Sequence, residues 1–116
     1  MKRNVFYIER ESFLRSMLEI AFKHAKEEIY TIDTIVDNYY LLDDLNPALI
    51  FFDVKTVGDE LENLLAYHQT NLKSAVLIAT GTEEDKEKVS GRVKDFILKP
   101  IPATNLVKKI LHYLSV

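Results

Sequence analysis

Asp53, Thr80 and Lys99 each stand directly after a short apolar run of the chain, and they supply a carboxylate, a hydroxyl and an amine. A charged group that begins with Glu9 follows the first apolar run in the same way. If these runs are neighbouring parallel strands, their carboxyl ends meet at one edge of a sheet. Open α/β folds place their ligands and their chemistry at that edge. The function of the chain is therefore to be sought there.

The elements that must position these residues can be read from the apolar pattern. Five runs of about five mainly apolar residues are typical of strands buried on both faces, and they cover 4–8, 28–32, 48–52, 75–79 and 96–98. Between them, helices are predicted over 14–25, 36–42, 57–68, 83–89 and 106–114. Alternating strands and helices imply right-handed crossovers. The pattern predicts one α/β domain over 1–116, a doubly wound parallel sheet between two layers of helices.

Two helix starts carry capping signals. Thr82 precedes Glu83-Glu84-Asp85, so its hydroxyl is predicted to cap a helix whose first carboxylates lie at the positive end of the helix dipole. Thr104 is predicted to cap the last helix, with Pro102 just ahead of it. Both positions agree with the predicted helix limits.

Composition excludes several classes of function. The chain has 116 residues, no cysteine and a net charge of −3. Disulfides and thiol chemistry are absent, a reducing compartment is the simplest interpretation, and the cytoplasm is the expected location. No run is long enough to span a bilayer, and no clustered basic stripe indicates nucleic-acid binding by this domain. Three glycines form no phosphate-binding loop, and the three histidines lack metal-ligand spacing.

Glutamate, aspartate, threonine and lysine thus follow the first, third, fourth and fifth predicted strands. This arrangement resembles the receiver domain of two-component response regulators. The resemblance covers essentially the whole chain, and it implies a flavodoxin-like (βα)5 fold with strand order 2-1-3-4-5. In that family the peptide bond before the proline that matches Pro100 is usually cis. The segments that carry the resemblance are YIERESFLR at 7–15, PALIFFD at 47–53, VLIATG at 76–81 and DFILKP at 95–100.

The resemblance assigns roles to residues at each strand end. Asp53 matches the aspartate that accepts a phosphoryl group from a histidine kinase or a phosphotransfer protein. Thr80 matches the residue that hydrogen-bonds a phosphoryl oxygen, with Gly81 in the neighbouring small position. Lys99 matches the lysine that pairs with the acceptor carboxylate, so its ammonium group is expected to point toward Asp53. Phe96 matches the aromatic residue that rotates on activation.

The resemblance also implies a Mg²⁺ site, from which this chain departs. Receivers hold the ion with the acceptor aspartate, a backbone carbonyl two residues later and an acidic pair after the first strand. Here Glu9 and Asp53 are the candidate ligands, whereas Arg10 takes the second acidic place, and a guanidinium cannot coordinate a metal. Lys55 adds a second cation near the expected carbonyl. We therefore expect weak or absent Mg²⁺ binding, with Arg10 or Lys55 within ion-pair reach of Asp53.

Several functions remain open at this point. The chain is either a receiver with weak metal-dependent phosphorylation or a pseudo-receiver that acts without phosphate. The segment 51–57 also resembles the first motif of haloacid-dehalogenase-type phosphatases. However, Lys55 stands where that motif needs a general acid, and no acidic residue follows Lys99. We therefore expect a signalling domain, not an enzyme. The third possible class of function is a protein interaction module that does not depend on phosphorylation.

Two further expectations concern surfaces and loops. The segment 54–59 is read as a loop, and Lys99, at the edge of the sheet, is expected to contribute little to the core. The short helix over 83–89, the fifth strand and the last helix are predicted to form a face for self-association or for a protein partner. The charged residues expected on that face are Glu83, Glu84, Asp85, Lys94, Lys108 and Lys109.

Overall fold

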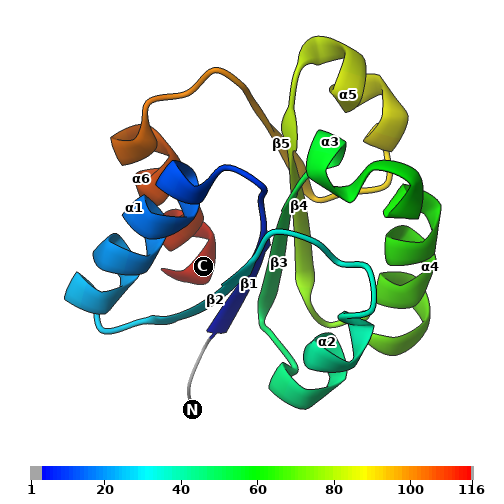
Figure 1. The fold of residues 1–116 in the computed structure, drawn as a ribbon, viewed down its shortest axis with the longest axis horizontal. Helices are drawn as coiled ribbons and strands as arrows, with labels where there is room; N and C mark the ends of the chain where they lie inside the picture. Colours follow the sequence, from blue (N-terminus) through cyan, green and yellow to red (C-terminus); the bar gives the residue numbers. More distant parts are fainter. Residues whose placement is uncertain (1–3, 116) are drawn as a thin grey trace.

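The computed structural model describes residues 4–115, and within them five parallel strands form one sheet (Figure 1). The strand order is β2-β1-β3-β4-β5, as expected. Every neighbouring pair is parallel, with Asp53 of β3 directly beside Thr80 of β4. The strands are β1 (Asn4–Ile8), β2 (Glu28–Ile32), β3 (Leu49–Asp53), β4 (Val76–Gly81) and β5 (Asp95–Leu98).

Helices cover both faces of this sheet. In Figure 1, α1 and α6 lie on one side of the strands, and α2, α4 and α5 lie on the other. The helices are α1 (Ser12–His24), α2 (Tyr39–Leu45), α3 (Val54–Val57), α4 (Leu61–Asn71), α5 (Glu83–Val89) and α6 (Ala103–Ser115), with a 3-10 turn η1 (Gly58–Glu60) before α4. The three-layer fold predicted from the sequence is confirmed.

The core is divided between the two faces because side chains alternate along each strand. Phe6, Ile50 and Phe52 pack with α2, α3, α4 and α5 in one cluster. Tyr7 and Phe51 stack on each other in the second cluster, which includes apolar residues of α1 and α6. All five residues of β3 are buried. The apolar run before Asp53 is therefore the central strand of the sheet, and it fixes the position of that carboxylate.

Thr82 caps α5 as predicted, but three local predictions are wrong. Thr104 lies inside α6, since the carbonyl of Pro102 accepts hydrogen bonds from the first turn of that helix. The segment 54–59 is not a loop; α3 and η1 cover it, because the Asp53 side chain caps the first turn. The helix after β2 begins only at Tyr39, since Asp37 adopts a positive φ of 63°, which a helix does not allow.

No helix in the part of the chain that the structure describes is both long and apolar enough to cross a membrane.

Candidate functional site

The predicted strand-end residues meet at the carboxyl edge of the sheet. Asp53 ends β3, Thr80 lies near the end of β4, and Lys99 follows β5. Glu9 follows β1, where its amide extends the ladder by donating to the carbonyl of Ile32 at 2.9 Å. The parallel register thus brings together four residues that lie up to 90 positions apart in the chain.

Lys99 connects two buried carboxylates at this edge. Its Nζ lies 2.8 Å from Oε1 of Glu9 and 3.0 Å from Oδ1 of Asp53. Glu9 is 0% exposed and Asp53 is 4% exposed. Burial alone would lower the pKa of Lys99, but its hydrogen bonds to the two carboxylates outweigh that effect and raise the pKa above its ordinary value. The predicted contact between Lys99 and Asp53 is therefore present, and the ammonium group is shared with Glu9.

The backbone holds Lys99 in this position. Its amide donates to the carbonyl of Gly81 at 2.7 Å, which continues the pairing of β4 with β5. The peptide bond between Lys99 and Pro100 is cis, as the resemblance implies. The strand end and the turn together aim the side chain toward β3 and β1.

Glu9 has further partners that sequence reasoning missed. The hydroxyl of Tyr7 donates to Oε1 at 3.0 Å, and the amide of Glu11 donates to Oε2 at 3.3 Å. Burial, followed by the charge of Glu9, raises the pKa of Tyr7 far above its usual value, so this hydroxyl stays protonated. A tyrosine two residues before Glu9 on the same buried strand points to the same face of the sheet, and this spacing is the signal available in the sequence.

Both oxygens of Asp53 are occupied. While Oδ1 faces Lys99, Oδ2 accepts hydrogen bonds from the amide of Thr56 at 2.9 Å and from its hydroxyl at 2.7 Å. The Thr56 hydroxyl in turn accepts from the amide of Arg10 at 3.0 Å. Sequence reasoning missed Thr56, although aspartate is a preferred helix N-cap residue whose carboxylate accepts from the amide two or three residues into the helix. Thr56 thus orients the acceptor carboxylate and ties it to the segment after β1.

The prediction that Arg10 or Lys55 pairs with Asp53 is wrong. Within residues 4–115, neither cation forms an ion pair with that carboxylate. Lys55 instead reaches α5, where its Nζ lies 2.8 Å from Oδ2 of Asp85. The side chain of Arg10 is exposed, and its backbone amide donates to the hydroxyl of Thr56. The physical reason is that Asp85 is a buried charge that needs a cation, whereas Lys99 and Thr56 already satisfy Asp53.

Asp85 was expected on the surface, in the face for a partner, but it is only 1% exposed. It completes the capping box of α5, since Oδ2 accepts from the amide of Thr82 at 3.0 Å and from its hydroxyl at 3.1 Å. Burial by itself raises the pKa of Asp85. The hydrogen bonds from Lys55 and Thr82 more than reverse this effect, so the pKa lies below its ordinary value.

Thr80 lies in β4 and Phe96 lies in the neighbouring strand β5. The hydroxyl of Thr80, fully buried, donates to the carbonyl of Ile97 at 2.6 Å, so in this structure it is engaged with β5. Phe96 is partly buried against the cluster of apolar residues that includes Val89 of α5. Both residues occupy the positions predicted from the sequence, and their roles in phosphoryl signalling stay predictions.

The donor set fits a divalent cation poorly. Mg²⁺ requires several oxygen ligands in near-octahedral geometry, but Oε1 of Glu9 and Oδ1 of Asp53 both contact the Lys99 ammonium. In the described part of the chain, no group of three or more acidic, histidine or cysteine side chains is arranged to hold a metal ion. An ion would therefore compete with a cation already in place.

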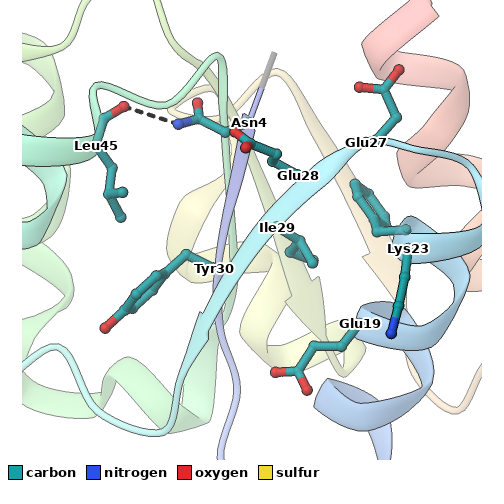
Figure 2. A pocket seen from close by; sticks show the side chains of 9 residues that line it. Asn4, Glu19, Lys23, Glu27, Glu28, Ile29, Tyr30 and Leu45 are labelled. Atoms are coloured by element: carbon teal, nitrogen blue, oxygen red, sulfur yellow. Dashed lines mark hydrogen bonds between the residues drawn. The ribbon is translucent and has the colours of Figure 1, made fainter. Parts of the chain in front are cut away.

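Two hollows help to locate the site. One of about 160 Å³ is lined by Glu9, Asp53, Lys99 and their neighbours at the carboxyl edge. Another of about 470 Å³ lies at the opposite edge, around the start of β2, where Asn4 donates to the carbonyl of Leu45 (Figure 2). The second hollow contains none of the strand-end residues, so the chemistry predicted from the sequence belongs to the first.

The lowered pKa of Asp85 predicts a pH-dependent loss of stability. The folded protein keeps this carboxylate ionised where the unfolded chain protonates it. Its contribution is thus fully present above the ordinary pKa of 3.8 and is lost as the pH falls through the lower folded value. We expect the free energy of unfolding, measured with urea, to fall more steeply on acidification in the wild type than in Asp85→Asn. Parallel pH profiles for the two proteins would contradict this assignment.

Solved structures of response regulators have the same fold as this chain. The orphan response regulator HP1043 of H. pylori has a TM-score of 0.80 and 21% sequence identity, over 97% of this chain and 96% of that chain. A response regulator from Thermotoga maritima has a TM-score of 0.80 at 17% identity, over 100% of both chains. The chemotaxis response regulator CheY4 of Vibrio cholerae has a TM-score of 0.76 at 15% identity, over 97% and 98%.

No protein-family model matches the chain, and no curated protein sequence matches it. At these identities, the likeness to the solved structures establishes the fold. The chain has the flavodoxin-like fold of response regulator receiver domains.

Proposed function

We propose that this chain is a receiver-type signalling domain in which Asp53 is the phosphoacceptor position. The observation that carries the proposal is the contact of Lys99 Nζ with both Asp53 and Glu9 at the carboxyl ends of parallel strands. The fold alone would permit many functions. A buried carboxylate beside a partly exposed ammonium group, at the edge where such sheets bind ligands, favours functions that act on an anionic group.

Phosphoryl transfer suits these residues. A carboxylate oxygen of Asp53 would form a bond to phosphorus while the bond between phosphorus and the donor breaks. The donor would be a phosphohistidine of a histidine kinase or phosphotransfer protein, or a small acyl phosphate. Because this transfer depends on positioning and on neutralising charge, Lys99 would balance the phosphoryl oxygens. Thr56 would hold the other carboxylate oxygen in place.

The proposal includes weak or lost metal dependence. Arg10 stands where the second acidic ligand is expected, and the Lys99 ammonium lies between the two carboxylates that remain. Phosphorylation that depends on Mg²⁺ is therefore expected to be slow, and a domain that signals without phosphate is the limiting case. A phosphatase is not favoured, because Lys55, at the place of the general acid, pairs with Asp85.

The partner would be a protein. We assign the partner face to α5, β5 and α6, on which Leu98 is an apolar side chain that is 41% exposed. The charges on this face are Glu83, Glu84, Lys94, Lys108 and Lys109, all exposed, while Asp85 is removed from the predicted set by its burial. A homodimer or a heterologous protein would use this face. Cytoplasmic location and no direct contact with nucleic acid are part of the same proposal.

Replacing Arg10 by aspartate should create a measurable magnesium site. The change removes a cation and adds an oxygen ligand, which is expected to tighten Mg²⁺ binding by about tenfold or more, since about 1.4 kcal/mol suffices for that factor. Calorimetric titration of the wild type and of Arg10→Asp measures the difference, and Arg10→Asp combined with Asp53→Asn is the control that should lose the gain. Sub-millimolar affinity in the wild type that disappears in Asp53→Ala would contradict the proposal.

A further inference from the structure

We propose that the ion pair between Lys55 and Asp85 is a clamp that holds α5 in one arrangement without a phosphoryl group. The clamp joins the segment directly after Asp53 to the first turn of α5. A regulatory role for the clamp rests on the proposed receiver function. In that case the ion pair, and not the charge on Asp53, would control the position of α5 in the partner face.

Burial of the Asp85 carboxylate is the first observation behind the clamp. The residue is 1% exposed, and the closest cation is Lys55 Nζ at 2.8 Å from Oδ2. Lys88 is farther, at 4.0 Å from Oδ1, and the two lysine side chains are similarly exposed, at 49% for Lys55 and 55% for Lys88. A buried carboxylate without a close cation is costly. Lys55 is therefore the close cation that, together with the hydrogen bonds from Thr82, stabilises the Asp85 carboxylate in this position.

The turn before α5 is fitted to this arrangement. A Cβ atom at Gly81 would lie 2.6 Å from Oδ2 of Asp85 and 2.8 Å from its Cβ, so glycine lets the aspartate pack against the backbone. The same Oδ2 accepts the amide and the hydroxyl of Thr82. These hydrogen bonds lie within the first turn and would move with it, whereas the ion pair to Lys55 joins the turn to the segment after Asp53. The helix start is thus held by several interactions on one carboxylate.

The clamp lies between the acceptor site and the proposed partner face. Lys55 is two residues after Asp53, and α5 is part of that face. At its other end, α5 buries Val89 in the cluster against which Phe96 packs. The carbonyl of Gly81 also accepts the amide of Lys99. The ion pair therefore joins the segment after Asp53 to the turn that precedes α5 and that also contacts Lys99 at the end of β5.

Hydrogen exchange of α5, followed by mass spectrometry or NMR, tests the clamp. The amides of Asp85 and Lys86 report on it, because they donate to Thr82 in the first turn. We expect both to exchange about tenfold faster, or more, in Lys55→Met than in the wild type. Lys88→Met is the matched control and should leave both rates unchanged. Unchanged protection in α6 verifies that the variant is folded.

Two results would overturn the clamp. One is equal exchange of α5 in the wild type and in Lys55→Met. The other is α5 amide exchange in Asp53→Asn that is as fast as in Lys55→Met. The clamp is proposed to be independent of the charge on Asp53, so we expect Asp53→Asn to exchange at the wild-type rate. Failure of the phosphoacceptor assignment would leave all these rates as they are, so the two proposals fail separately.

Discussion

Replacing Lys99 by methionine should lower the free energy of unfolding by about 3 kcal/mol. Removing one partner of a buried ion pair typically costs about 3 to 5 kcal/mol, and the lower end applies because the Lys99 side chain is 22% exposed. In the variant, the buried carboxylates of Glu9 and Asp53 would face each other without a cation. Urea unfolding followed by circular dichroism at neutral pH measures the effect.

Two comparisons make this prediction specific. Lys108→Met removes an exposed lysine of α6 and should change stability by well under 1 kcal/mol. Adding Glu9→Gln to Lys99→Met should recover part of the loss, because it removes one of the two unpaired charges. A Lys99→Met protein as stable as Lys108→Met would show that the buried carboxylates do not depend on this cation.

The contribution of Lys99 to stability could not be predicted from the sequence. From the sequence, Lys99 is a charge at the edge of a sheet, a kind of residue that contributes little to stability. The structure places its ammonium beside a glutamate that is completely buried. Glu9 is contacted there by the amide of Glu11 after β1 and by Lys99 after β5, which the fold brings together. No pattern of residues along the chain reports these contacts.

Lys55 illustrates the same limit in another way. Both possible partners, Asp53 and Asp85, are acidic residues near the carboxyl edge, and the sequence alone favoured the nearer one. What decides is that Asp53 already has Lys99 and Thr56, whereas Asp85 is buried by its capping box. The Thr82-x-x-Asp85 spacing is typical of a capping box, in which the Asp85 side chain turns back toward the start of the helix. It predicts the helix start, but it does not show that Asp85 is buried. Ion-pair partners depend on burial, which tertiary packing sets.

The fold was predictable for a physical reason. Parallel strands buried on both faces must be nearly continuous apolar runs, so their limits are visible in the sequence, and the polar residues at their ends mark the site. The helix limits were less certain, because a residue that can cap a helix is also tolerated inside its first turn. This happened at α6, which begins at Ala103, so that Thr104 lies within the helix and the carbonyl of Pro102 accepts from the amides of Asn105 and Leu106.

The central claim is that Asp53 is a receiver-type phosphoacceptor whose metal-dependent reaction is weakened by Arg10. Intact-mass spectrometry after treatment with acetyl phosphate and Mg²⁺ tests it most directly. Four proteins are compared, namely the wild type, Arg10→Asp, Asp53→Asn and the combination of the last two. Omitting Mg²⁺ from parallel reactions isolates the part of the reaction that depends on the metal.

We expect little modification of the wild type. In Arg10→Asp we expect a Mg²⁺-dependent initial rate about tenfold higher, or more, since an added carboxylate ligand and a lost cation both favour binding of the ion. Both proteins with Asp53→Asn should remain unmodified. Equal rates for the wild type and Arg10→Asp, no reaction in Arg10→Asp, or modification that persists in Asp53→Asn would each contradict the account.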